Sequence, residues 1–187
     1  MKYGIVVIGA SLGGLQAVHK VLAGLPGDFP LPLAVAQHRR QEGGDSLLFV
    51  LQDSCALSVR EGEDKLPIMP GCVYLAPSGY HLLVDGDHFA LSTESPVSYA
   101  QPSIDVLFES AADTFGRRAI GVVLTGSGRD GAAGLAAIKQ RGGVALVESA
   151  ETALAAEMPD AARAATPGAK SLRIEAIPLC LLELSRK

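Results

Sequence analysis

The stretch from Val6 to Gly14 constrains the fold of this chain more than any other feature of the sequence. Three β-branched residues run into Gly9-Ala10-Ser11 and two further glycines, which is typical of a buried strand that ends in a tight turn. Beyond the turn, apolar residues recur at the helical period: Leu15, Val18, Val21 and Leu22. This order places Ser11 beyond the carboxyl end of the strand, where open α/β sheets bind ligands. Ser11 is therefore a candidate nucleophile, and the alternative at this point is that its hydroxyl caps the helix.

Strands and helices are predicted to alternate along the rest of the chain. Apolar runs predict further strands at residues 33–37, 57–59, 72–76, 119–124, 144–147 and 172–174. Helical spacing predicts helices at 45–52, 103–115 and 131–141, from about 153 with an interruption at Pro159, and from Pro178. Asp85-Gly86-Asp87 lies between two apolar runs and predicts a β-hairpin. The alternation indicates an α/β fold, namely a doubly wound, mostly parallel sheet flanked by helices with one antiparallel hairpin, in a single domain over residues 1–187.

The composition narrows the classes of function. Hydrophobic residues make up 48% of the chain and charged residues 19%, which is typical of a folded domain. A net charge of −4 without a basic block argues against nucleic acid or an anionic membrane as the main partner. No apolar run approaches the roughly 20 residues of a membrane span, and the N-terminus lacks a signal-peptide pattern, so we expect a cytoplasmic protein without membrane insertion. Cys55, Cys72 and Cys180 lack metal-finger spacing and are expected to be buried free thiols.

Three of the predicted strands end in loops that carry complementary chemical groups. Ser11 follows the first strand, His38 follows the second, and Asp130 lies in the loop after residues 119–124. Because the carboxyl ends of parallel strands lie at one edge of a sheet, the three side chains can meet there as nucleophile, general base and orienting carboxylate. Each residue also has a simpler interpretation: His38 as the polar end of a strand, and Asp130 as the cap of the helix that follows it.

Three other histidines compete for the role of base. His19 falls in the middle of a predicted helix, and His81 and His88 flank the predicted hairpin and are expected to face solvent. No metal or cofactor is expected, because the loop from Gly126 to Gly134 offers one carboxylate and neither His nor Cys.

Several segments resemble the catalytic domain of the chemotaxis protein-glutamate methylesterase (CheB) family. They follow one another in the family's order along nearly the whole chain: Ile8 to Gly14, Ala36 to His38, Pro70 to Pro77, Pro102 to Phe108, Leu124 to Gly134 and Glu157 to Pro159. The resemblance implies a serine carboxylesterase that hydrolyses glutamate methyl esters on chemoreceptors, releases methanol and often deamidates glutamine. It implies Ser11, His38 and Asp130 as the catalytic triad and a methylated chemoreceptor or similar protein as partner. The family's usual protein carries an N-terminal receiver domain, which is expected to be absent because the chain begins at the first catalytic strand.

Two departures from the family pattern fall beside the candidate site. Leu12 stands where the family has Thr, and Ser127 stands where it has Met, at positions linked to the oxyanion hole. Backbone N–H donors survive both changes, whereas a side-chain hydroxyl at Leu12 does not. One alternative is therefore a catalytically degraded module that docks receptors or a signalling partner.

A second alternative is an NADP-binding domain. It rests on the glycine-rich turn and on Arg39-Arg40, which stand where the family has Met-Pro and could hold a 2′-phosphate. The glycine spacing is not G-x-G-x-x-G, and this interpretation leaves Asp130 unexplained.

Overall fold

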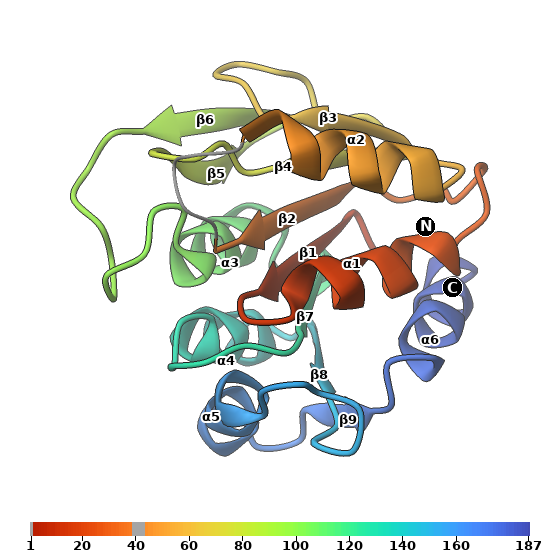
Figure 1. The fold of residues 1–187 in the computed structure, drawn as a ribbon, viewed down its shortest axis with the longest axis vertical. Helices are drawn as coiled ribbons and strands as arrows, with labels where there is room; N and C mark the ends of the chain where they lie inside the picture. Colours follow the sequence, from red (N-terminus) through yellow and green to blue (C-terminus); the bar gives the residue numbers. More distant parts are fainter. Residues whose placement is uncertain (1, 39–43) are drawn as a thin grey trace.

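The computed structural model describes residues 2–38 and 44–187 and arranges them as helices on both faces of a central sheet (Figure 1). The sheet has seven strands in the order β3-β4-β2-β1-β7-β8-β9, and all of its strand pairs are parallel. The strands are β1 (Ile5–Ala10), β2 (Leu33–Gln37), β3 (Ser58–Glu61), β4 (Cys72–Leu75), β7 (Ala119–Val123), β8 (Val144–Glu148) and β9 (Lys170–Leu172). The predicted doubly wound, mostly parallel α/β fold is confirmed.

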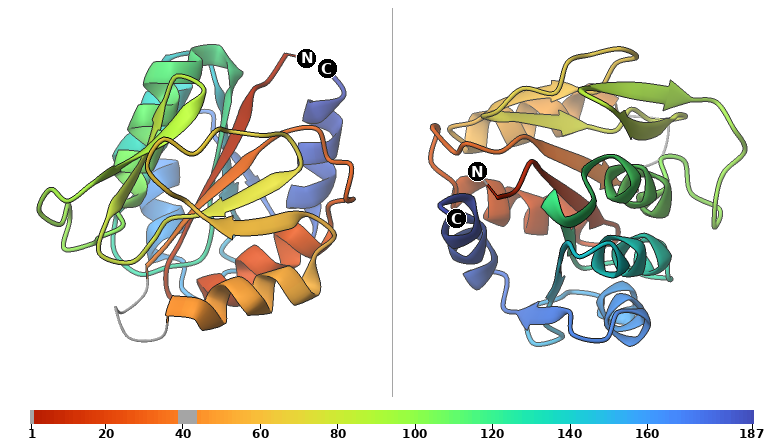
Figure 2. Two further views of the ribbon diagram at one scale, coloured as in Figure 1. Left: turned by 90° about the horizontal axis from the view of Figure 1, so that it is seen from above. Right: turned by 180° about the vertical axis from the view of Figure 1, so that it is seen from behind.

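Three helices cover each face of the sheet (Figures 1 and 2). One face carries α1 (Gly14–Ala23), α2 (Gly44–Ser54) and α6 (Ala176–Ser185). The other face carries α3 (Ile104–Phe115), α4 (Ala132–Gln140) and α5 (Glu157–Ala165), and a short 3-10 helix, η1 (Gly116–Arg118), follows α3. The predicted hairpin forms from β5 (His81–Asp85) and β6 (His88–Ser92), and it packs against α3.

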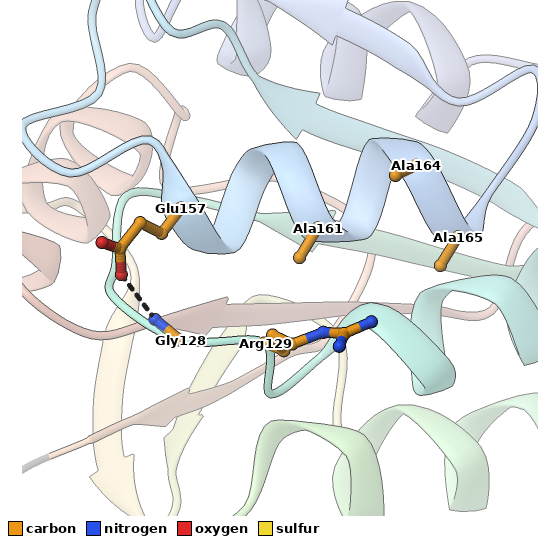
Figure 3. A pocket seen from close by; sticks show the side chains of 6 residues that line it. All are labelled: Gly128, Arg129, Glu157, Ala161, Ala164 and Ala165. Atoms are coloured by element: carbon orange, nitrogen blue, oxygen red, sulfur yellow. Dashed lines mark hydrogen bonds between the residues drawn. The ribbon is translucent and has the colours of Figure 1, made fainter.

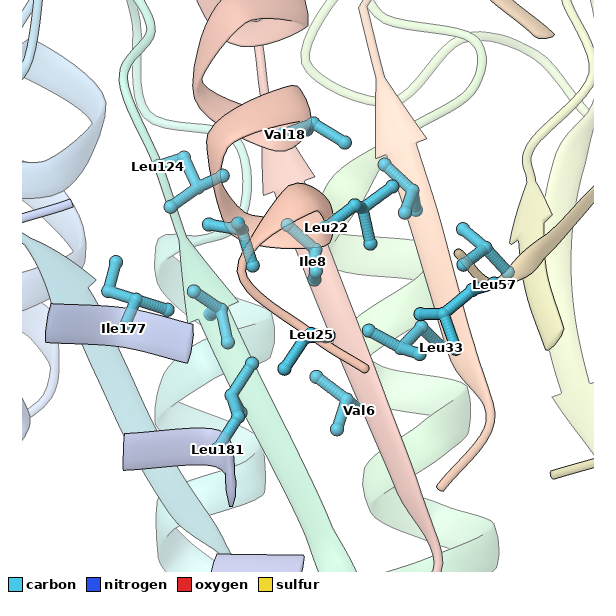
Figure 4. Close-up of a cluster of buried hydrophobic side chains, with 14 of the residues drawn as sticks. Val6, Ile8, Val18, Leu22, Leu25, Leu33, Leu57, Leu124, Ile177 and Leu181 are labelled. Carbon is cyan, nitrogen blue, oxygen red and sulfur yellow. The ribbon is translucent and has the colours of Figure 1, made fainter. Parts of the chain in front are cut away.

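The side chains of the central strand alternate between two apolar clusters. Val6 and Ile8 point into the cluster under α1 and α6, where Figure 4 shows Ile8 near Leu22 and Val6 near Leu25. Ile5 and Val7 belong to the cluster on the other face, under α3 and α4. All four side chains are fully buried, because a parallel strand with helices on both faces has no solvent side. This explains why β1 is a continuous apolar run in the sequence.

The C-terminal elements begin at other residues than the sequence predicted. Helix α5 begins at Glu157 rather than near residue 153, and Pro159 lies in its first turn instead of interrupting it. Proline is tolerated there because the first N–H groups of a helix have no partner within the helix. Strand β9 covers residues 170–172 rather than 172–174, and Pro178 likewise lies in the first turn of α6.

Two further expectations concern the cysteines and the membrane. Cys55, Cys72 and Cys180 are free thiols, but they are half-buried rather than buried. Among the residues that the structure describes, no helix has both the length and the apolar character needed to cross a membrane.

The N-terminal ends of α3 and α4 are capped by carboxylates from each other's segments. Asp130, which precedes α4, accepts hydrogen bonds from the N–H groups of Ile104 (2.7 Å) and Asp105 (2.9 Å) in the first turn of α3. Asp105 in turn accepts a hydrogen bond from the N–H of Gly134 (2.7 Å) in the first turn of α4. Each carboxylate meets the positive end of a helix dipole, so these contacts hold the N-terminal ends of the two helices together.

The capping of α4 by Asp105 predicts how the stability of the fold depends on pH. Burial, with a smaller contribution from the charge of Asp130, raises the pKa of Asp105 from 3.8 to about 6 against the lowering effect of the Gly134 N–H. A carboxyl whose pKa is raised on folding binds more protons in the folded chain, so it lowers the free energy of unfolding as the pH rises between these two values. Asn at this position keeps an oxygen for Gly134 but does not titrate. We therefore expect Asp105→Asn to gain stability relative to the wild type as the pH rises from about 4 to about 6.

Urea unfolding at steps across this pH range measures the difference. Glu183→Gln removes an exposed carboxyl on α6, away from the contact between α3 and α4, and serves as the control. A difference between Asp105→Asn and the wild type that does not change with pH would contradict the raised pKa of Asp105.

A second prediction concerns the close approach of α3 and α4. A Cβ atom at Gly134 would lie 2.5 Å from Cβ of Phe108 and 3.0 Å from the backbone oxygen of Asp105. Since backbone cannot move away cheaply, we expect Gly134→Ala to lower the free energy of unfolding by about 1–3 kcal/mol despite the better helix propensity of Ala. Ala133→Ser adds one heavy atom on the exposed side of the same turn, and denaturant unfolding should show a change within about 0.5 kcal/mol. Equal stability of Gly134→Ala and the wild type would argue against the close approach.

Candidate active site

The candidate site lies at the carboxyl edge of the sheet, beside the ends of β1 and of its two neighbouring strands. Strand β2 lies on one side of β1 and β7 on the other, so the loops after these three strands meet at the carboxyl edge. Hydrogen bonds continue past the strand ends: the N–H of His38 donates to the oxygen of Ala10 (3.0 Å), and the N–H of Ser11 donates to the oxygen of Thr125 (3.0 Å). This is the switch point at which open α/β sheets bind their ligands.

Ser11 occupies the turn between β1 and α1 and is half-buried. Its backbone oxygen accepts hydrogen bonds from the N–H of Gly14 (2.9 Å) and from Nε2 of Gln37 (2.9 Å). The N-cap residue of α1 is Gly13, and among the described residues no side-chain hydrogen bond caps this helix. The alternative that the Ser11 hydroxyl caps the helix is therefore wrong.

The loop after β7 packs directly against this turn. A Cβ atom at Gly126 would lie 2.8 Å from Cβ of Ser11 and 2.6 Å from Sδ of Met158, so no larger residue fits without a shift. The N–H of Met158 donates to the oxygen of Gly126 (3.0 Å), and the N–H of Gly126 donates to the oxygen of Ala155 (3.0 Å). The start of α5 thus holds the loop against the Ser11 turn.

His38 and Asp130 form a close pair at this edge. Nε2 of His38 lies 2.7 Å from Oδ2 of Asp130, with the imidazole partly exposed and the carboxylate almost fully buried. An ionised carboxylate can only accept, so Nε2 carries the proton and Nδ1 is left as the acceptor. Burial alone would raise the pKa of Asp130, but the His38 ring and the N–H groups of Ile104 and Asp105 outweigh it, so the pKa is lowered and the carboxylate stays charged.

Asp130 also caps a helix, but not the helix that the sequence suggested. The N-cap of α4 is Gly131, and the carboxylate that caps this helix is that of Asp105, so the interpretation of Asp130 as the cap of the following helix is wrong. Oδ1 of Asp130 accepts from Oγ of Ser103 (2.9 Å) and from the N–H of Asp105, while Oδ2 accepts from the N–H of Ile104 and from His38. Each carboxylate oxygen therefore accepts two hydrogen bonds, and the carboxylate is shared between His38 and the start of α3.

A second set of Ser and His side chains surrounds the same carboxylate. His81 is only 1% exposed, so the expectation that it faces solvent is wrong. Its Nδ1 accepts from the N–H of Ser103 (3.1 Å) and its Nε2 donates to the oxygen of Ser95 (3.2 Å), which explains why the ring is buried. The Ser103 hydroxyl is fully buried and donates to Asp130 rather than to an imidazole. His81 therefore cannot take its proton, and this second set anchors α3.

The predicted oxyanion donors, Leu12 and Ser127, flank the Ser11 turn. Both residues are exposed, Leu12 at 57%. Within residues 2–38 and 44–187, neither backbone N–H donates to another group of the chain, which leaves both available to a ligand. Arg39 and Arg40, which the sequence placed next to His38, lie outside the described residues.

The loop that carries Asp130 also lines a hollow of about 570 Å³ beside α5 (Figure 3). Gly128 and Arg129 form one wall, and Glu157 and three alanines of α5 form the other: Ala161, Ala164 and Ala165. Oε2 of Glu157 accepts a hydrogen bond from the N–H of Gly128 (3.1 Å), which ties the two walls together. In the described ranges, His, Cys, Asp and Glu side chains nowhere gather in the threes that a metal site would need.

Three residues that hold this edge together, Gln37, Thr125 and Glu148, were not predicted from the sequence. Gln37 was quoted only as part of a motif, yet its Nε2 donates to the backbone oxygens of both Ser11 (2.9 Å) and His38 (3.0 Å). Thr125 and Glu148 join the loop after β7 to the end of β8. Their only sequence signal is a polar residue at or just beyond the end of a buried strand, which does not reveal its partner.

Comparison with known proteins agrees with this geometry. The sequence model of the CheB methylesterase family matches residues 6–181. A protein-glutamate methylesterase/protein-glutamine glutaminase of Anaeromyxobacter dehalogenans is 44% identical over 182 residues, 97% of this chain and 53% of that protein. A Leptospira interrogans protein provisionally named for the same two activities is 39% identical over 187 residues, 100% of this chain and 97% of its own length.

A solved structure has the same fold. The catalytic domain of the Thermotoga maritima CheB methylesterase superposes with a TM-score of 0.93 at 32% sequence identity, covering 98% of this chain and all of that domain. The resemblance first seen in the Ser11, His38 and Asp130 segments thus extends over the whole sheet and both layers of helices. This chain belongs to the CheB methylesterase family.

Proposed function

We propose that this chain is a serine hydrolase that cleaves glutamate methyl esters on a protein, with Ser11, His38 and Asp130 as its catalytic triad. The observation that carries the proposal is the 2.7 Å contact between His38 Nε2 and Asp130 Oδ2 at the sheet edge where Ser11 ends β1. Family membership supports this hydrolase function rather than the binding module or the NADP-binding domain. The relatives named as glutaminases support glutamine deamidation as a second reaction of the same site.

The proposed reaction begins at the Ser11 hydroxyl. Its oxygen attacks the ester carbonyl carbon while Nδ1 of His38 takes the hydroxyl proton, and Asp130 stabilises the imidazolium through Nε2. The N–H groups of Leu12 and Ser127 donate to the oxyanion that forms. Methanol leaves with the proton from His38, or ammonia does when the substrate is glutamine. Water, deprotonated by His38, then releases glutamate from the acyl-enzyme.

The departures at Leu12 and Ser127 are compatible with this proposal. Both residues contribute through their backbone N–H groups, which every residue except proline possesses.

We propose a methylated chemoreceptor as the protein substrate, as the family resemblance implies.

We expect Ser11→Ala to abolish turnover. The loss should be several orders of magnitude, because the remaining groups cannot form the acyl-enzyme. Methanol release from a methylated receptor fragment measures the reaction, and thermal unfolding should show a fold as stable as the wild type. Ser95→Ala removes the hydroxyl of an exposed serine and should leave turnover unchanged. Substantial methanol release by Ser11→Ala would refute the triad and favour the binding module.

A further prediction separates the two roles of Asp130, namely the cap of α3 and the orientation of His38. Asn offers one oxygen where the carboxylate offers two, so Asp130→Asn should lose about 1–3 kcal/mol of stability from the cap of α3. It should also lose turnover by about 10²–10⁴-fold, because the His38 tautomer is no longer fixed.

Ser103→Ala is the matched control for this prediction. It removes a hydrogen bond to the same carboxylate from the side of α3, without touching His38. It should cost about 1 kcal/mol of stability and keep most of the turnover. Turnover that falls equally in the two variants would mean that Asp130 acts only through the fold.

A further inference from the structure

We propose that Thr125 and Glu148 are positioning residues, which fix the orientation of the Ser11 turn from behind. Both side chains are buried, Thr125 just beyond the end of β7 and Glu148 at the end of β8. The inference rests on the proposed function for its reaction and adds how the nucleophile and its oxyanion donor are held in place.

Thr125 binds both sides of the nucleophile. Its backbone oxygen accepts from the N–H of Ser11 (3.0 Å), and its Oγ1 donates to the oxygen of Leu12 (3.0 Å). The same Oγ1 accepts from the N–H of Ala155 (2.9 Å), with the oxygen of Ala155 slightly farther away than that of Leu12, at 3.3 Å. The hydroxyl therefore joins the Ser11 turn to the loop that leads into α5.

These two contacts hold the backbone on both sides of the proposed nucleophile. The Ser11 N–H belongs to the peptide that precedes Ser11, and the Leu12 oxygen belongs to the peptide that follows Leu12. Together with the hydrogen bonds that the Ser11 oxygen accepts from Gly14 and Gln37, they fix the direction of the Ser11 side chain and of the Leu12 N–H. The first is the proposed nucleophile and the second is the proposed oxyanion donor, so a shift of this segment would misplace both.

Glu148 holds Thr125 in turn. It is the last residue of β8, is 2% exposed, and its Oε2 accepts from the N–H of Thr125 (2.8 Å). Its other oxygen, Oε1, accepts from Oγ1 of Thr152 (3.0 Å). Burial raises the pKa of Glu148, because removing a charged carboxylate from water is unfavourable. An apolar side chain would avoid that cost, but it would leave the N–H of Thr125 without its acceptor.

The test compares pairs of variants that keep or lose one hydrogen-bonding group. Thr125→Val loses the hydroxyl and keeps the shape, whereas Thr125→Ser keeps the hydroxyl. Glu148→Met loses the acceptor, whereas Glu148→Gln keeps one oxygen for Thr125. Thr166→Val is the matched control, because the Oγ1 of Thr166 is buried without a hydrogen-bond partner among the described residues.

We expect Thr125→Val and Glu148→Met to lower kcat by about 10–100-fold, the effect of misplacing a reacting group by a fraction of an ångström to an ångström. KM should change little, because neither residue touches the substrate. Thr125→Ser and Glu148→Gln should restore most of the lost kcat. Kinetics on methylated receptor fragments, and the rate at which a fluorophosphonate labels Ser11, measure the effect at a temperature where every variant is folded by circular dichroism.

The inference would be overturned if Thr125→Val labels and turns over like the wild type. It would also be overturned if Thr125→Ser and Thr166→Val lose as much activity as Thr125→Val, since the effect would then follow general packing. Ser11→Ala is run beside these variants. If Ser11→Ala keeps its activity, the proposed function fails, whereas an inactive Ser11→Ala with an unaffected Thr125→Val removes only the positioning role.

Discussion

The hydrogen bonding of β1 on both of its edges is the constraint on which the rest of the structure depends. Its residues pair with β2 along one edge and with β7 along the other, both in parallel. Parallel pairing brings the carboxyl ends of three successive strands in the sheet to the same level. The turn after β1, the residue after β2 and the loop after β7 therefore meet, although they are up to 119 positions apart in the sequence when Ser11 is compared with Asp130.

The Asp130 carboxylate couples the site to the stability of the fold. Its oxygens accept from His38 on one side and from Ser103, Ile104 and Asp105 on the other. A buried carboxylate with this many donors stays ionised, which is what an orienting partner of an imidazole requires. The same contacts cap α3, and Asp105 caps α4 in return. The Asp130 carboxylate thus contacts His38 and caps α3 at the same time. The position of His38 therefore depends on the packing of α3 and α4.

The Ser11 turn is held through its backbone by residues of other elements. Gln37 reaches it from β2, Thr125 from the loop after β7, and Gly126 lets that loop approach within van der Waals contact. This arrangement explains how the chain accommodates Leu12 and Ser127 at positions where its family has other residues. A donor supplied by the backbone does not depend on the side chain, provided that the peptide is held in the correct orientation.

The sequence by itself determined the elements of this protein and located its candidate catalytic groups. Buried apolar runs specified the strands, Asp85-Gly86-Asp87 specified the hairpin, and polar residues at three strand ends pointed to Ser11, His38 and Asp130. Periodicity and turn chemistry are local, so they can be read without knowing the fold. The catalytic roles of the three residues remain predictions.

Only the tertiary structure decided which groups are partners. It inserted β4 between β3 and β2, gave the carboxylate of Asp130 to α3 instead of α4, and buried His81 against the N–H of Ser103. It also selected Nε2 as the nitrogen of His38 that meets Asp130, and it joined Thr125 to Glu148. The physical reason is that a polar group at the end of a strand or helix needs a hydrogen-bond partner, and the sequence offers several candidates for that partner. The order of the strands and the packing of the helices settle which of them lies within hydrogen-bonding distance.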